Sequence, residues 1–299
     1  MSLIRNLLGL SRVPHSILDV ALPAFAALAW IGAFPSAKIT VIGLVTAISA
    51  YLAMYALNDV VDACVDREKR KQAPAHNQEG YLDAVLIAHP LAQGKLSKKT
   101  ALIWVGGLLL IAVMGAFVLN PMTLWILALG AIAEVSYCLL FKKSAWRVLL
   151  SGLVKTCGPM AAVLAVDHAP SLGLLFLLFS WIFFWEIGGQ NIPADWVDVA
   201  QDRSVKAKTL PIQLGFEKAR ILIMGSLVLA VVFNLIFLAM SPLAFRVPAL
   251  VITGVISWLA LLIPAWRLYQ SKDPCHAKQL FNCASYYPLW MALLAGIFL

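Results

Sequence analysis

The sequence predicts an all-α membrane protein, a bundle of nine transmembrane helices that carries aspartate-rich motifs at its cytoplasmic surface. Hydrophobic residues make up 62% of the 299 residues and charged residues only 13%, and the mean hydropathy is +0.86. Soluble globular proteins average about 45–50% apolar and about 25% charged residues. Apolar runs recur along the whole chain, so we expect a single membrane domain over residues 1–299.

Nine apolar runs approach the length that crosses a bilayer, about 20 residues. The first run is interrupted by Asp19 and Pro23. In chain order, the runs lie at 17–34, 39–57, 101–119, 122–141, 148–166, 171–190, 219–240, 246–266 and 279–298.

The distribution of basic residues orients these helices, because the cytoplasmic loops of membrane proteins carry an excess of Lys and Arg. When the N-terminus is placed in the cytoplasm, only Lys38 and Arg246 of the 23 basic residues fall in loops on the other side, and Lys155 lies within a span. We therefore predict an integral protein of the cytoplasmic (inner) membrane with a cytoplasmic N-terminus. The net charge of +8 follows from this topology and indicates no nucleic-acid partner.

Two nine-residue stretches share the pattern D-x-V-D-x-x-x-D-R. They are Asp59-Val-Val-Asp62-Ala-Cys-Val-Asp66-Arg67 and Asp195-Trp-Val-Asp198-Val-Ala-Gln-Asp202-Arg203. Positions i, i+3 and i+7 of a helix share one face, so each stretch predicts a stripe of three carboxylates. A single D-x-x-D is often a solvated helix end, whereas two copies with the same spacing favour a shared site.

Carboxylates gathered at a membrane surface repel one another unless a cation lies between them. Oxygen-rich clusters of this kind suit Mg²⁺, which keeps positions for substrate phosphates. The two stripes therefore predict a cytoplasmic active site that handles a diphosphate.

Each stripe continues into a basic cytoplasmic loop, whose side chains would neutralise the remaining phosphate charge. The cations that follow the two stripes are Arg67, Lys69, Arg70, Lys71, Arg203, Lys206 and Lys208. Lys142, after the fourth span, is a further candidate and would serve equally well as a topological anchor.

The motifs resemble those of the UbiA superfamily of intramembrane aromatic prenyltransferases. Asn58-Asp59-x-x-Asp62-x-x-x-Asp66 is similar to the family's N-D-x-x-D-x-x-x-D signature, and the second stripe, with Lys206-Ala-Lys208-Thr209-Leu210-Pro211 after it, is similar to its second motif. The segment from His89-Pro90-Leu91 to Ser97 resembles the family's R-P-L-x-x-G-x-x-S segment. The resemblance covers essentially the whole chain, including the nine helices.

The chain departs from the family pattern in two places. His89 stands where the family usually has arginine, after an insertion that we place at Gln72–Ala88. The family's Y-x-x-x-K pattern is shifted by one position, because Tyr137 is followed by Lys142 at i+5. Either departure would alter a phosphate contact.

The resemblance implies a Mg²⁺-dependent prenyltransferase of quinone or lipid biosynthesis. A prenyl diphosphate would be the donor, and a hydrophobic or aromatic acceptor, such as a quinone precursor, would attack C1 of the prenyl chain as diphosphate leaves. Asp59, Asp62 and Asp66 would hold one Mg²⁺ ion, and Asp195, Asp198 and Asp202 a second. The implied substrate-binding residues are Asn58, Arg67, Lys71, Tyr137, Lys142, Asn191, Arg203, Lys206 and Lys208.

Ionisable residues inside the spans are candidates for the acceptor site, since charges in a membrane are costly and usually functional. They are Glu134 and Glu186, with Asp19 on the first span and His15 just before that span. Glu134 would equally well make a hydrogen bond between helices. On the helix that leads to the second stripe, the large apolar residues predict a wall for the prenyl tail: Phe179, Phe183, Phe184, Trp185 and Ile187.

Two other functions remain compatible with the motifs. A transferase that moves a phosphoribosyl group from a soluble diphosphate to a lipid phosphate would use the same metal chemistry. A secondary transporter would also contain repeats and intramembrane acids, although its acids would lie near the middle of the bilayer. The residues identify neither the acceptor, nor the length of the prenyl chain, nor the oligomeric state.

Overall fold

Most successive helices of the protein are separated by a few residues, whereas the helix that ends at Gln72 and the one that begins at Lys98 are separated by residues 73–97. The computed structural model describes residues 3–72, 86–87, 89–243 and 246–299, and no strand occurs among them. Most of the insertion predicted at Gln72–Ala88 lies outside the described residues. The elements are α1 (Leu3–Leu10), α2 (Val13–Asp19), α3 (Ala21–Ile31), α4 (Ala37–Gln72), α5 (Lys98–Leu119), α6 (Thr123–Leu139), η2 (Ala145–Arg147), α7 (Val148–Val166), α8 (Leu172–Trp185), η3 (Glu186–Asn191), α9 (Ile192–Val197), α10 (Val199–Ser204), α11 (Leu210–Met240), α12 (Arg246–Ser257), η4 (Trp258–Leu262), α13 (Ile263–Ser271) and α14 (Pro274–Ile297).

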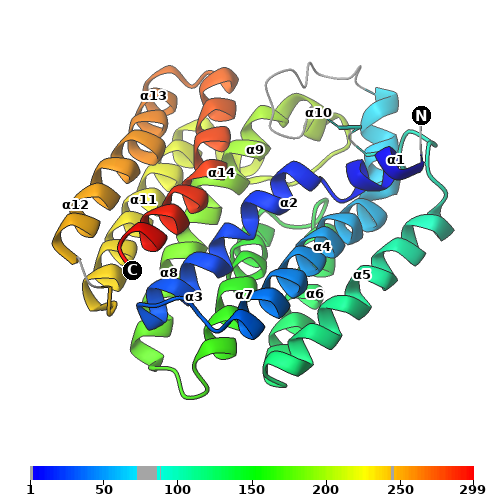
Figure 1. Ribbon diagram of the computed structural model, residues 1–299. Coiled ribbons are helices and arrows are strands. Elements are labelled where there is room, and N and C mark those ends of the chain that lie inside the picture. Colours follow the sequence, from blue (N-terminus) through cyan, green and yellow to red (C-terminus); the bar gives the residue numbers. More distant parts are fainter. Residues whose placement is uncertain (1–2, 73–85, 88, 244–245) are drawn as a thin grey trace.

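The helices form a bundle with α11–α14 at one side and α4–α6 at the other (Figure 1). Helix α3 packs against α7 and α14, α4 against α5 and α6, and α8 against α7 and α11. The N-terminal helices α2 and α3 therefore join the two sides of the bundle.

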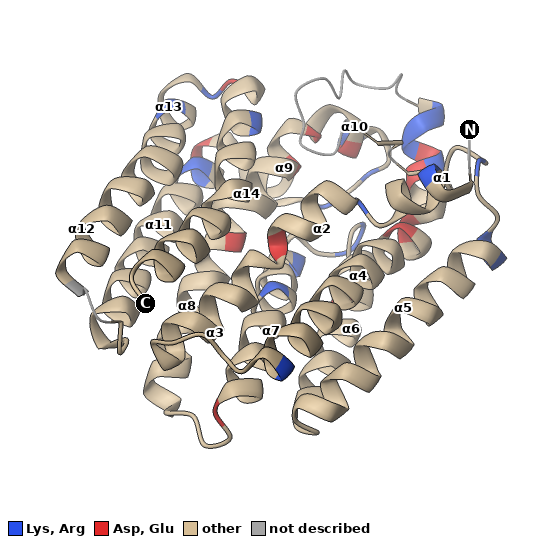
Figure 2. Cartoon of the chain, viewed as in Figure 1, with Lys and Arg blue, Asp and Glu red and all other residues tan. Residues whose placement is uncertain are grey.

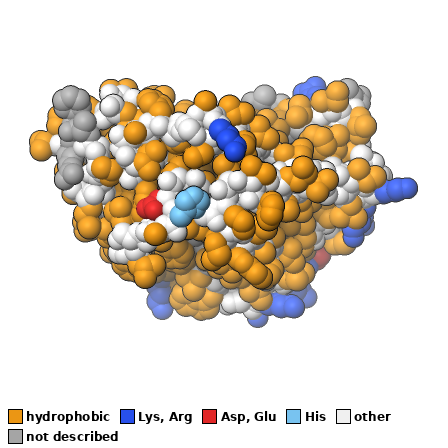
Figure 3. Space-filling model, turned by 60° about the horizontal axis from the view of Figure 1, so that its bottom comes forward, with side chains coloured by type: hydrophobic (Ala, Val, Ile, Leu, Met, Phe, Trp, Pro, Cys, Tyr) orange, Lys and Arg blue, Asp and Glu red, His pale blue; other side chains and the backbone are white. Residues whose placement is uncertain are grey.

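The outer surface of the bundle is apolar, as expected of helices that face lipid. Hydrophobic side chains cover most of the face drawn in Figure 3. Among the described residues, eight helical segments are long and apolar enough to cross a membrane, and the ninth predicted span is the 17-residue helix α6. The prediction of an all-α membrane bundle is therefore confirmed, and the predicted count of nine helices is close.

Two helices differ from the predicted spans. Helix α4 continues to Gln72, well beyond the predicted end at residue 57, and so carries the whole first Asp stripe on one helix. The first predicted span is broken between α2 and α3 at Val20. Pro23 explains the break, because a proline ring clashes with the carbonyl four residues earlier, here that of Asp19.

Two wide π turns, η3 and η4, interrupt the second half of the bundle. Each is followed at once by a proline, Pro193 or Pro264, in the first turn of the next helix. A proline inside a continuous helix would leave one carbonyl without its donor and crowd it, and the wider turn accommodates this change. The turn η3 matters for function, because it lies directly before the second Asp stripe.

We expect Gly188→Ala to destabilise the protein. A Cβ atom at Gly188 would lie 2.9 Å from the carbonyl oxygen of Ile223 and 2.9 Å from the Cβ of Ser226, and the backbone of α11 cannot rotate away. Overpacking of this kind costs about 1–3 kcal/mol, measured as a lower thermal midpoint in detergent. Gly107→Ala is the matched control: nothing lies within 4 Å of its added Cβ, so it should leave the midpoint unchanged or raise it. Equal midpoints for the two variants would contradict the close contact of η3 with α11.

Candidate active site

Charged residues gather at the end of the bundle where α4 ends and where α9 and α10 lie (Figure 2). The first Asp stripe faces inward there. His89, in the loop before α5, places its Nδ1 2.7 Å from Asp59 Oδ1 and 2.8 Å from Asp66 Oδ2. Among the described residues, these three form the one group of His, Cys, Asp or Glu whose ligand atoms all lie within 4.8 Å of one another.

His89 lies between the carboxylates of Asp59 and Asp66, two of the predicted metal ligands. Burial lowers its pKa, but the carboxylates of Asp66 and Asp59 outweigh this effect and raise the pKa to about 10. The backbone of His89 has φ 50°, a left-handed conformation that is strained for a residue other than glycine and is concentrated at functional sites. The histidine that departs from the family pattern therefore contacts the first stripe directly.

The remaining side chains of the first motif face helix α6. Asp62 lies within the electrostatic field of Asp66 and Arg147. Asn58 donates from Nδ2 to Glu134 Oε1 at 2.6 Å and lies 3.3 Å from Cys138 Sγ. Glu134 thus makes the contact between helices that was one of its two expected roles.

The second stripe is not on one continuous helix, and that expectation was wrong. The chain breaks at Asp198 (φ −88°, ψ 4°), between α9 and α10. Asp195 Oδ1 accepts a hydrogen bond from Arg147 Nη2 at 2.8 Å, and Asp202 Oδ1 lies 2.7 Å from Lys69 Nζ. Asp195 and Asp202 therefore each pair with a cation from another element, whereas Asp59 and Asp66 of the first stripe share His89.

Lys69 and Arg147 connect the two stripes through the ring of Phe141. Lys69 Nζ lies 4.5 Å and Arg147 Cζ 4.6 Å from the centre of that ring, and Arg147 also covers the ring of Tyr137 at 4.2 Å. Lys69 was predicted only as one of the cations that follow the first stripe, and Arg147 was not predicted as a site residue. Spacing could have indicated Lys69, since it lies three residues after Asp66 and seven after Asp62, on the face of the stripe. Arg147 follows a turn after α6, where no helical spacing applies.

The basic residues predicted to contact phosphate are not paired with the stripes. Arg67 is exposed and lies 3.4 Å from the carbonyl oxygen of Leu91, and Lys142 pairs with Glu68 at 2.6 Å. The other four are exposed at the same end of the bundle: Lys71, Arg203, Lys206 and Lys208. His89, Lys69 and Arg147 do contact Asp residues of the stripes.

A cavity of about 500 Å³ begins beside the Asp motifs and extends through the bundle between α2–α3, α4, α6, α7 and η3. At its upper end lie Asn58, Tyr137 and Asn191, three of the predicted substrate-binding residues, and Asn191 Nδ2 donates to the Tyr137 hydroxyl at 2.8 Å. Its other end is apolar and is lined by residues such as Leu28, Phe34, Leu119 and Val166. The cavity therefore joins a charged head region to an apolar channel.

Between these ends, the cavity is lined by ionisable residues predicted for the acceptor site, His15, Asp19 and Glu186, together with Lys155. The predicted tail wall is elsewhere, and that prediction was wrong. Phe179, Phe183 and Phe184 line a separate outer groove, while Trp185 and Ile187 are buried in the core. A membrane helix is apolar on every face, so composition alone could not tell which face meets the cavity.

Residues 20–294 match the model of the UbiA prenyltransferase family. The chain belongs to the UbiA prenyltransferase family. The digeranylgeranylglyceryl phosphate synthase of Methanopyrus kandleri is 28% identical over 214 residues, which span 70% of this chain and 66% of that protein.

Solved structures share the fold. The apo structure of a UbiA homolog from Aeropyrum pernix K1 matches with a TM-score of 0.74 at 19% identity, covering 95% of this chain and 98% of that one. A UbiA homolog from Archaeoglobus fulgidus bound to GPP and Mg²⁺ matches with a TM-score of 0.69 at 16% identity, covering 97% and 99%.

We expect Mg²⁺ to compensate for the loss of His89. In the metal-free protein, His89→Ala removes the imidazole that lies between Asp59 and Asp66, so the thermal midpoint in EDTA should fall. A divalent ion between the same carboxylates should restore most of it, giving the variant a larger Mg²⁺-induced rise than the wild type. Lys142→Ala is the control: an exposed pair such as Lys142–Glu68 is worth about 0–1 kcal/mol, and with both Asp stripes intact its Mg²⁺-induced rise should equal that of the wild type. A loss in His89→Ala that is the same with and without Mg²⁺ would refute this interpretation.

Proposed function

We propose that this member of the family transfers a prenyl group from a prenyl diphosphate to a hydrophobic acceptor and releases diphosphate. The observation that carries the proposal is the shape of the cavity: a charged end beside the Asp motifs, then a long apolar channel. A prenyl diphosphate has the same division into an anionic head and an apolar tail. In this arrangement the tail lies away from water, which protects an allylic cation from capture by solvent.

The Asp residues of both motifs would hold Mg²⁺. Their fit is supported by Asp59 Oδ2, a buried oxygen with no hydrogen-bond partner, and by the carboxylate oxygens that Mg²⁺ prefers. Bound there, the metal supplies positive charge that neutralises the departing diphosphate. Asp195, Asp198 and Asp202 complete the proposed set, and a second ion among them would release Arg147 and Lys69 for phosphate oxygens.

The exposed cations at the mouth would complete the diphosphate contacts. Their long side chains start from the same end of the bundle as the motifs, and those proposed are Arg67, Lys71, Lys142, Arg203, Lys206 and Lys208. Tyr137 and Asn191 lie at the top of the cavity, where they would border the reacting carbon of the donor.

Two classes of acceptor are proposed. The motifs resemble those of aromatic prenyltransferases, which supports an aromatic quinone precursor. The similarity to the Methanopyrus kandleri synthase, whose name gives a glyceryl phosphate lipid as its product, supports a glyceryl phosphate lipid as the second candidate. A phosphoribosyl donor is disfavoured, because a sugar diphosphate leaves the apolar end of the cavity unfilled.

A substrate panel with the purified protein in nanodiscs tests the donor. Affinity for geranylgeranyl or farnesyl diphosphate should exceed that for phosphoribosyl diphosphate by more than about tenfold, or about 1.4 kcal/mol.

Turnover should stop in EDTA and return with Mg²⁺, and Asp62→Ala and Asp198→Ala should each lose at least about 100-fold in kcat. Glu217→Gln, an acid-to-amide change at an exposed ion pair with Lys272, should remain active. A preference for the sugar donor would overturn the prenyl assignment.

We also propose that the Asp motifs face the cytoplasm, as the basic loops indicate. In a background without the native cysteines, Lys143→Cys should react with a membrane-impermeant maleimide only after the cytoplasmic face is opened. Ser36→Cys, at the opposite end of the bundle, should react in intact cells. Both positions are exposed, so the reversed labelling pattern would invert the proposed topology.

A further inference from the structure

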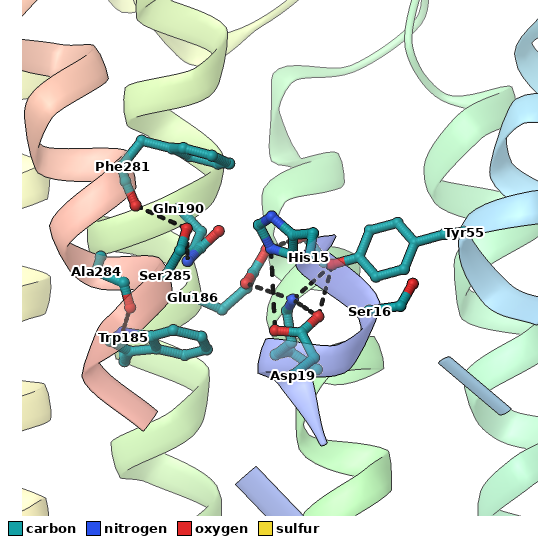
Figure 4. A network of polar contacts seen from close by, with 12 residues as sticks. His15, Ser16, Asp19, Tyr55, Trp185, Glu186, Gln190, Phe281, Ala284 and Ser285 are labelled. Carbon is teal, nitrogen blue, oxygen red and sulfur yellow. Dashed lines mark hydrogen bonds and ion pairs between the residues drawn. The ribbon is translucent and has the colours of Figure 1, made fainter. Parts of the chain in front are cut away.

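A second charged cluster lies in the cavity, deeper than the Asp motifs (Figure 4). Lys155 Nζ donates to Asp19 Oδ2 at 2.6 Å and to the Tyr55 hydroxyl at 3.1 Å, and Tyr55 donates to the same Asp19 oxygen at 2.6 Å. Glu186 Oε2 lies 3.7 Å from Lys155 Nζ. Asp19, Lys155 and Glu186 are 1%, 8% and 6% exposed, so this cluster is inside the protein.

The cluster lies on the side of the Asp motifs where the reacting carbon of the donor would be. Tyr55 lies four residues before Asp59 on α4, about 6 Å along the helix axis. Glu186 lies nine residues before Asp195, about 13 Å along the axis. The reacting carbon of a prenyl diphosphate is attached to the diphosphate, so a donor held by the motifs places that carbon on the side of the cluster.

Glu186 is held so that its carboxylate faces the cavity. On one side of the turn η3, Gln190 Nε2 donates to Ser285 Oγ at 3.0 Å and Trp185 Nε1 donates to the carbonyl of Ala284 at 3.2 Å, which fastens the turn to α14. Glu186 points the other way, toward Asp19 and His15 (Figure 4). Ser151 on α7 donates to Glu186 Oε1 at 2.5 Å.

One oxygen of Glu186 remains without a hydrogen bond. Oε2 is buried and has no hydrogen-bond partner, and the ammonium at 3.7 Å is beyond hydrogen-bond distance. An unpaired buried carboxylate oxygen costs free energy, and in this cavity a hydroxyl donor from a ligand would satisfy it.

Lys155 is the ammonium of the cluster and faces two carboxylates, with the imidazole of His15 at 3.9 Å from Asp19. An anionic head group would therefore be repelled here, whereas an uncharged hydroxyl would be bound.

We propose that Glu186 accepts the proton of an uncharged hydroxyl group on the acceptor, a role that rests on the proposed prenyl transfer. The bond between C1 of the donor and the diphosphate oxygen breaks, and its electron pair leaves with diphosphate. The acceptor forms a bond to C1 through the hydroxyl oxygen of an alcohol, or through the ortho ring carbon of a phenol, whose ring hydrogen then moves to the oxygen. The hydroxyl proton passes to Glu186 Oε2. Ser151 and Lys155 are positioning residues that hold the carboxylate.

The isosteric variant Glu186→Gln tests this role, with prenyl transfer and diphosphate release measured separately. Transfer to a phenolic acceptor and to a glyceryl lipid with a free hydroxyl should each be measured, since either can supply the proton. We expect kcat for transfer to fall by about 100-fold or more, the usual contribution of a general base. Donor affinity and the slow release of diphosphate without acceptor should stay at wild-type values. Glu186→Asp, which keeps a carboxylate, should lose less.

Two further variants separate this role from a structural one. Asp167→Asn makes the same acid-to-amide change at the other end of the bundle, where Asp167 accepts from Trp30 Nε1, and should transfer at the wild-type rate. Ser151→Ala removes one hydrogen bond from Glu186 and should lower kcat about tenfold, or about 1.4 kcal/mol, without changing donor affinity. It also tests the role if Glu186→Gln does not fold.

Three outcomes would lead to different conclusions about Glu186 and about the proposed function. Wild-type transfer in Glu186→Gln would overturn the role of Glu186 and leave the prenyltransferase assignment intact. A parallel loss of donor affinity, diphosphate release and transfer would assign Glu186 to structure and also overturn it. Absence of transfer by the wild-type protein, with every acceptor and donor tried, would instead refute the proposed function itself.

Discussion

Carboxylates inside a membrane protein need cations close by, and the arrangement of this bundle follows from that requirement. Removing a carboxylate from water costs several kcal/mol unless an opposite charge compensates. Here Asp59 and Asp66 share His89, Asp195 pairs with Arg147, and Asp202 pairs with Lys69. These pairs connect α4 to the loop before α5, α9 to the turn η2, and α10 to α4. The same contacts that neutralise the motifs therefore also bring together segments that are far apart in the sequence.

The parts of this structure that follow from local periodicity could be predicted from the sequence. The spans follow from hydropathy, and the first Asp stripe follows from helical spacing, because α4 is continuous from Ala37 to Gln72. The second stripe repeats the same spacing, yet its helix breaks at Asp198. The partners of the stripes depend on packing between distant segments: His89 reaches α4 from a loop, and Arg147 reaches α9 from a turn. The tail wall was misplaced for a related reason, since hydropathy does not distinguish a face that meets lipid from one that meets a cavity.

The protein has two charged layers, the Asp motifs beside the upper end of the cavity and the cluster of Asp19, Lys155 and Glu186 that lines the cavity. The upper layer has more carboxylates than cations and leaves Asp59 Oδ2 unpaired, which suits a divalent ion. The lower layer carries its own ammonium, Lys155, between Asp19 and Glu186. Under the proposed reaction, departure of diphosphate and removal of the acceptor proton would therefore occur at separate sets of residues, and changes in the lower layer could alter the acceptor without disturbing the metal site.

The π turn η3 restricts the number of residues that can lie between Glu186 and Asp195. Residues five apart in an α-helix point about 140° apart, but Glu186 and Asn191 both line the cavity, because the turn between them holds an extra residue. Deleting one residue from this turn would rotate everything after it by about 100°, including Asp195 and its contact with Arg147. The number of residues between Glu186 and Asp195 is thus as restricted as their identity. An alignment or a redesign that treats this stretch as ordinary helix of free length would misplace the second motif.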